Sequence, residues 1–139
     1  MIWIGIDTGV NTGVAMWNEG AFRFIKTMQL HQALAYVHYT FDINDRKGVT
    51  VVFEDARLRK WYGTYTAKQD RDKLQGAGSV KRDCKIWEEA LCDWGIPFVR
   101  LAPKNNLTKL SAEQFQRITG WKGKTNEHGR DAAMLVFGR

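Results

Sequence analysis

Three acidic residues stand where this sequence could perform chemistry. Asp7 ends one apolar run, Glu54 ends another, and Asp131 lies early in a segment with a helical pattern. His128 precedes Asp131 by three residues, so both are expected on one helix face. If the two strands are neighbours, their carboxyl ends bring Asp7 and Glu54 together. Such a group of carboxylates suits Mg²⁺ or Mn²⁺, because the acids would otherwise repel one another.

Each of these acids taken singly is more simply explained as the polar end of a strand or helix. The three together favour a metal site, because Asp7 and Glu54 close runs that are otherwise apolar and do not belong to a solvated charged face.

A second group of residues indicates a polyanionic partner. The formal net charge is +6, and the excess is concentrated in residues 57–85 (net +6) and 100–130 (net +5), whereas residues 1–56 carry −2. Basic and aromatic side chains are interleaved after Glu54, a pattern that suits phosphates and unpaired bases. We predict nucleic-acid contacts from Arg57, Arg59, Lys60, Trp61, Tyr62, Tyr65 and Lys68, continued by Lys104 and Lys109. The alternative is a solvated charged run with buried aromatic rings.

The elements that must position these residues follow from apolar runs, helical periodicity and turn residues. We expect strands at residues 2–7, 12–17, 21–28, 49–54 and 98–102, and helices at 30–41, 79–94, 111–119 and 127–137. This order predicts an α/β fold with a mixed five-stranded sheet, in which three antiparallel strands precede the parallel ones, and with helices on both faces.

Length and composition restrict the class of protein. The chain of 139 residues is 44% hydrophobic, which fits a single globular domain over residues 1–139. No apolar run approaches the roughly 18 residues of a membrane span, so we expect a soluble, cytoplasmic protein without a membrane partner. Cys84 and Cys92 form no CxxC motif and are expected to be free thiols.

Taken together, the motifs resemble those of the RuvC-type Holliday junction resolvases of the RNase H-like superfamily. Residues 5–13 read GIDTGVNTG and are similar to the family's first-strand motif. Residues 52–55, VFED, resemble its fourth-strand glutamate segment, and residues 128–133, HGRDAA, resemble its carboxy-terminal helix. The resemblance spans essentially the whole chain and looks most like compact phage or prophage versions. Thr8 replaces the usual proline, and the first glycine turn is shorter.

The resemblance implies an RNase H-like fold and a Mg²⁺-dependent endodeoxyribonuclease that resolves four-way junctions. Asp7, Glu54 and Asp131 would bind two Mg²⁺ ions, with His128 in the fourth position and Mn²⁺ as a possible substitute. In such a reaction, two metal ions activate a water molecule and stabilise the leaving oxygen of a phosphodiester.

Spacings of four, three and four residues place Val80, Cys84, Trp87 and Leu91 on one helix stripe. Such a stripe fits either a helix packed on a sheet or a helix–helix seam. The resemblance favours the seam and a homodimer, whose two active sites would match a junction with two-fold symmetry.

Three other classes of function share part of these features. A hydrolase of RNA–DNA hybrids would use the same acids, and a non-catalytic module for branched DNA would need only the basic segments. An actin-like ATPase or sugar kinase also begins with a strand, an aspartate and a glycine turn, but it needs a second copy of the domain, which 139 residues cannot hold.

Overall fold

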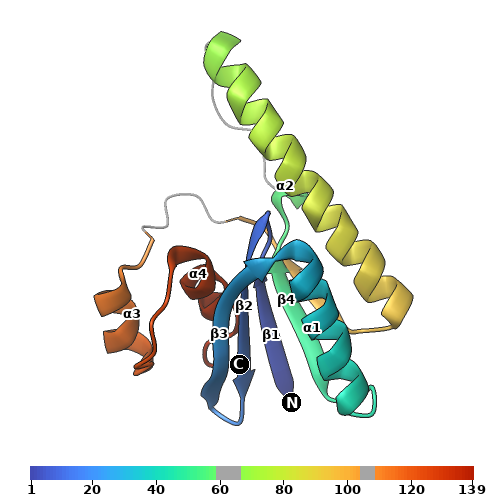
Figure 1. Cartoon of the computed structure of the whole chain (residues 1–139), viewed down its shortest axis with the longest axis vertical. Helices are drawn as coiled ribbons and strands as arrows, with labels where there is room; N and C mark the ends of the chain where they lie inside the picture. The colour runs from blue at the N-terminus through green and yellow to red at the C-terminus, as the bar shows by residue number, and fades with distance from the viewer. Residues whose placement is uncertain (59–66, 104–108) are drawn as a thin grey trace.

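The computed structural model describes residues 1–58, 67–103 and 109–139, with only the backbone for residues 67–77. Its centre is a five-stranded sheet in the order β3-β2-β1-β4-β5 (Figure 1). The strands are β1 (Ile2–Asp7), β2 (Asn11–Asn18), β3 (Ala21–Gln29), β4 (Val49–Glu54) and β5 (Phe98–Leu101). β1 pairs antiparallel with β2 and parallel with β4, β2 pairs antiparallel with β3, and β4 pairs parallel with β5. The predicted mixed sheet is therefore confirmed.

Among the described residues, four α-helices and one 3₁₀ turn accompany the sheet. They are α1 (Leu30–Ile43), η1 (Ala56–Leu58), α2 (Ala67–Trp94), α3 (Ala112–Thr119) and α4 (Glu127–Val136). α2 begins at Ala67, well before the predicted start at Ser79, and its first half projects beyond the sheet (Figure 1). The prediction missed this half because its residues are mostly polar, so no apolar period marks it as a helix.

Two separate clusters of buried side chains lie on the two faces of the sheet. The first cluster contains Ile4, Ile6, Val51 and Phe53 from the strands and is covered by α1 and α2. The second contains Val52 and residues of α4 and α3. Because successive side chains of a strand point to opposite faces, the β1 and β4 residues can be assigned to one face or the other.

The stripe on α2 belongs to the first of these clusters, which corrects one prediction. The side chains of Cys84, Trp87 and Leu91 are fully buried within the single chain, and Val80 packs against the same cluster. The core of this chain has already taken up the apolar surface of Cys84, Trp87 and Leu91, so these three residues are not available for a seam with a second copy.

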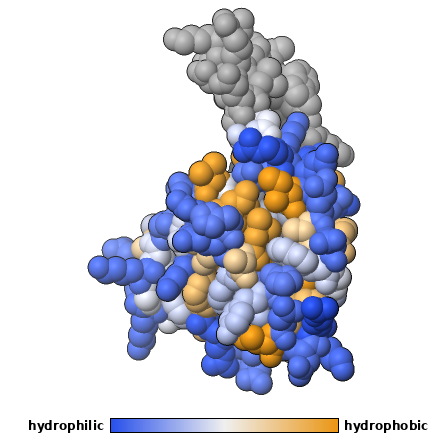
Figure 2. All heavy atoms as spheres, turned by 45° about the vertical axis from the view of Figure 1, so that its right-hand side comes forward, coloured by the Kyte–Doolittle hydropathy of each residue, from blue (hydrophilic) through white to orange (hydrophobic). Residues whose placement is uncertain are grey.

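The hydropathy of the surface is mixed. Figure 2 shows hydrophilic residues over most of the visible face, with hydrophobic residues gathered in a band down its middle. Within the described ranges, no helix has both the length and the apolar character needed to cross a lipid bilayer.

Candidate functional site

Asp7 and Glu54 lie at the carboxyl ends of adjacent parallel strands. The register pairs Ile6 with Phe53, the residues that directly precede the two acids. Ile6 and Phe53 face the α1–α2 side of the sheet. By alternation, Asp7 and Glu54 face the α4 side. The sequence prediction that these two strand ends meet is thus confirmed.

Two glycines allow α4 to lie directly on this face. A Cβ atom placed on Gly5 would overlap the carbonyl oxygen of Ala132, and one on Gly13 would overlap the carbonyl oxygen of His128. Helix backbone therefore rests on strand backbone where a side chain would normally separate them. The sequence motif contains both glycines, but their contact with a helix was not predicted. The signal available was that both stand inside predicted strands.

The amino-terminal end of α4 is held by its capping residue. The Asn126 side-chain oxygen accepts the backbone N–H of Gly129 at 2.9 Å, as an N-cap does. The same oxygen accepts the hydroxyl of Thr27 on β3 at 2.5 Å. The amino-terminal part of α4, which carries His128 and Asp131, is thereby fixed relative to the sheet.

His128 is in direct contact with Asp7. Its Nδ1 atom lies 3.0 Å from Oδ2 of Asp7, although the two residues are far apart in the sequence. Burial and the nearby charge of Asp131 raise the pKa of Asp7 above its ordinary value of 3.8, against the lowering effects of His128 and Lys109. The carboxylate of Asp7 is therefore held in an environment that disfavours its charge.

Lys109 reaches the same group of acids from the other side. Its Nζ atom lies 3.4 Å from Asp131 and 3.7 Å from Glu127. Partial burial opposes the protonated form, but the charges of Asp131, Glu127 and Asp7 prevail and raise the pKa of Lys109. Arg130 holds the adjacent chain, since its Nε donates to the carbonyl oxygen of Leu110 at 2.9 Å. The positive charge of Lys109 therefore partly neutralises the negative charge of these acids.

The donor set has the chemistry that a hard divalent cation requires. Asp7, Glu54 and Asp131 supply carboxylate oxygens and His128 supplies an imidazole nitrogen. The raised pKa of Asp7 is an electrostatic strain that a cation would relieve. Within the part of the chain that the structure describes, no three such side chains are grouped closely enough to surround one ion. A cation would have to compete with His128 for Asp7 and with Lys109 for Asp131.

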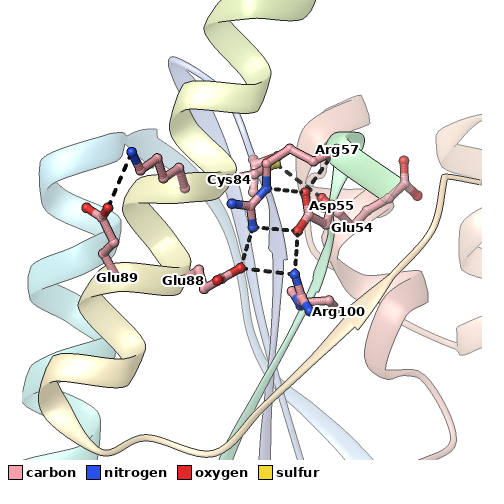
Figure 3. Close-up of polar contacts among 9 residues, drawn as sticks. Glu54, Asp55, Arg57, Cys84, Glu88, Glu89 and Arg100 are labelled. Atoms are coloured by element: carbon pink, nitrogen blue, oxygen red, sulfur yellow. Dashed lines mark hydrogen bonds and ion pairs between the residues drawn. The ribbon is translucent and has the colours of Figure 1, made fainter. Parts of the chain in front are cut away.

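Most of the predicted nucleic-acid contacts fall outside the described residues or side chains: Arg59, Lys60, Trp61, Tyr62, Tyr65 and Lys104, and the side chain of Lys68. Arg57 is described, and its guanidinium binds the carboxylates of Asp55 and Glu88 (Figure 3). This intramolecular role was not predicted, because a sequence pattern does not show that Glu88, far along the chain, lies nearby.

The similarity of this chain to known proteins is limited to its fold. No family model matches this sequence, and no curated protein matches it. A solved structure of T. thermophilus RuvC in complex with Holliday junction substrate matches with a TM-score of 0.56. The match covers 99% of this chain and 90% of that chain, with 16% identical residues. The chain thus has the RNase H-like α/β fold found in that protein.

Proposed function

We propose that this protein is a divalent-metal-dependent endonuclease that cuts four-way DNA junctions. One observation carries the proposal: Asp7 and Glu54 end adjacent strands, on the face of the sheet that is covered by α4 with His128 and Asp131. The fold is shared with a protein solved in complex with a Holliday junction. An open sheet binds its ligand at the carboxyl ends of its strands, which is where these acids stand.

The residues at this site have separable tasks in the proposed reaction. Asp7, Glu54, Asp131 and His128 would hold two Mg²⁺ ions, or Mn²⁺ in their place. Bound metal would supply an activated water and would stabilise the charge on the leaving oxygen. Lys109 neutralises part of the acidic charge and so limits its repulsion of a DNA phosphate.

Binding of the junction would depend on the basic and aromatic segment after η1. Arg59, Lys60 and Lys68, with Lys104, carry charge that suits phosphates, and Trp61, Tyr62 and Tyr65 carry rings that suit unpaired bases. Changing Trp61 and Tyr62 to alanine is expected to weaken binding to a junction more than binding to a duplex, because only unpaired bases expose their faces. Equal losses on both DNAs would contradict the stacking role.

A homodimer would place two sites on a junction that itself has two-fold symmetry. The α2 stripe is unavailable, but Tyr39 and Ile43 lie one turn apart on α1 with 63% and 59% exposure. We propose that this α1 face contacts a second copy. Light scattering should show a dimer for the parent and a monomer for Tyr39→Glu with Ile43→Lys, and a dimer of the double variant would contradict this interface.

The test of the proposed activity is cleavage of a substrate panel. A four-way junction, a flap, a duplex and an RNA–DNA hybrid are incubated with the parent or with Asp7→Asn, in Mg²⁺, Mn²⁺ or Ca²⁺. We expect the parent to cut the junction in Mg²⁺ or Mn²⁺ and only to bind it in Ca²⁺, while Asp7→Asn binds without cutting. Preferred cutting of the hybrid would indicate a ribonuclease, and binding without any cutting would indicate a non-catalytic module.

A further inference from the structure

The residue that directly follows Glu54 is fixed by an unusual number of contacts. The Asp55 side chain is fully buried. Arg57 donates from Nε to Oδ1 at 2.9 Å and from Nη2 to Oδ2 at 2.7 Å, and its backbone N–H also donates to Oδ1 at 3.0 Å. The backbone N–H of Asp55 donates to the carbonyl oxygen of Leu101 on β5 at 2.8 Å. Both the main chain and the side chain of Asp55 are therefore held.

The contacts continue into α2 and β5 and form what we call the Asp55 network: Asp55, Arg57, Glu88 and Arg100 (Figure 3). Oε2 of Glu88 accepts Nη2 of Arg57 at 2.5 Å and Nη1 of Arg100 at 3.1 Å. Nη1 of Arg100 also lies 3.5 Å from Oδ2 of Asp55. Two cations and two carboxylates thus balance, and they join the start of η1 to α2 and β5.

Asp55 is fully buried, whereas the side chains of Arg57, Glu88 and Arg100 are partly exposed. Removing charges from water is costly, and apolar side chains of similar size often stabilise a buried position as well or better. Ion pairs and bidentate guanidinium contacts instead impose distance and direction. The nearby pair of Lys85 and Glu89, one turn along α2, is an ordinary surface pair with both side chains more than 60% exposed. Glu88 and Glu89 carry the same charge on the same helix, and they differ in the residues that they contact.

The Asp55 network anchors the chain directly after Glu54. Successive residues of an extended chain point to opposite sides, so anchoring Asp55 on the α2 side directs Glu54 to the α4 side, where Asp7 lies. Figure 3 shows the Glu54 side chain pointing away from Glu88. The Cys84 thiol contacts the main chain of Glu54. Its sulfur lies 3.7 Å from the carbonyl oxygen of Glu54 and 3.5 Å from the Thr8 hydroxyl.

The geometry points to Asp55 and Glu88 as positioning residues that hold Glu54 in place for a divalent cation. This inference rests on the proposed nuclease site, at which Glu54 is one of the ligands. Outer partners of metal ligands commonly change metal affinity about 10–100-fold when they are removed. Asp55 and Glu88 would act in that manner without contacting the ion.

The experiment compares Asp55→Asn and Glu88→Gln with Glu89→Gln, the matched control on the same helix. Mn²⁺ binding to each folded protein is measured by calorimetry, and hydrogen exchange of residues 49–58 is measured without metal. We expect Asp55→Asn and Glu88→Gln to bind Mn²⁺ about tenfold more weakly or worse and to exchange faster over this segment. Glu89→Gln should match the parent in both measurements.

Unchanged Mn²⁺ affinity in both network variants would overturn the inference, whether or not exchange is faster, because the network would then serve only stability. If Asp55→Asn does not fold, Glu88→Gln decides alone, since Glu88 is partly exposed and its change is milder. A parent protein that binds no Mn²⁺ and cuts no junction would refute the proposed function itself. A parent that binds Mn²⁺ while the network variants behave like it would refute only the positioning role.

Discussion

Gly13 on β2 lies against the carbonyl oxygen of His128, so closely that a Cβ atom at this position would overlap it. Gly13 is also the register partner of Asp7 on β1. Gly13 therefore allows the start of α4 to lie close to the strand pair that contains Asp7, as Gly5 on β1 does one turn further along α4. The approach of His128 to Asp7 depends on an absent side chain as much as on the two residues themselves.

Replacing Gly13 by alanine is expected to displace α4 from the sheet. Overpacking of this kind costs about 1–3 kcal/mol, and the free energy of unfolding measured in urea should fall accordingly. Gly78→Ala is the matched control, because Gly78 is an exposed helical glycine with nothing within 4 Å of its added Cβ. The control should leave stability unchanged or raise it by up to about 1 kcal/mol. Equal stability of Gly13→Ala and the parent would show that α4 yields without cost.

The strands and the meeting of Asp7 with Glu54 were predictable because they depend on local patterns. Apolar runs identify β1 and β4, and alternation assigns their terminal acids to a face. The close approach at Gly13 was not predictable, since a glycine inside a strand has many explanations until the helix above it is placed. The reason for this glycine becomes apparent only from the tertiary contact between α4 and β2.

Two other features of the structure could not be predicted for the same reason. The spacing of Cys84, Trp87 and Leu91 describes a helix stripe equally well whether a sheet or a second helix covers it, and the structure shows the sheet. Arg57 was predicted to bind nucleic acid from the basic character of its segment. Its carboxylate partner Glu88 is distant in sequence, and only the packing of α2 brings the two together.

Asp7→Asn is expected to stabilise the metal-free protein at neutral pH while it abolishes cleavage. Burial and Asp131 raise the pKa of Asp7, so the protonated carboxyl favours folding at low pH and this contribution is lost as the pH rises through the raised value. Removing the charge should raise the free energy of unfolding at neutral pH, because the buried carboxylate then no longer has to be ionised. Thermal unfolding should show this gap closing toward pH 3.8, the ordinary value for the group. A less stable variant at neutral pH would mean that Asp7 is a structural anchor.

Lys109→Met is expected to tighten the binding of Mn²⁺ to the metal-free protein. The ammonium group lies 3.4 Å from Asp131 and competes with a cation for that carboxylate. An exposed ion pair is worth up to about 1 kcal/mol, so calorimetry should show an affinity gain of about two- to fivefold. Lys122→Met is a suitable control, because Lys122 is an exposed lysine that follows α3. Weaker binding in Lys109→Met alone would assign Lys109 to orienting Asp131 instead.

His128 offers the sharpest test of the site, because replacing it by alanine should cause a large loss of cleavage whereas replacing it by aspartate should retain cleavage. The hydrogen bond from His128 lowers the pKa of Asp7 against the larger effect of burial. In His128→Ala that support is lost, the pKa of Asp7 rises further, and the acidic limb of the cleavage rate should move to higher pH along with a large loss of activity.

His128→Asp restores an oxygen ligand, so it should retain cleavage and shift the metal preference from Mn²⁺ toward Mg²⁺, because imidazole suits the softer ion. Cleavage rates of both variants in each metal, measured from pH 3.8, the ordinary value for the aspartate, upward to neutral pH, provide the measurement. If His128→Ala cuts junctions as fast as the parent with an unchanged acidic limb, His128 is only a polar residue at the start of α4, and its contact with Asp7 has no part in catalysis.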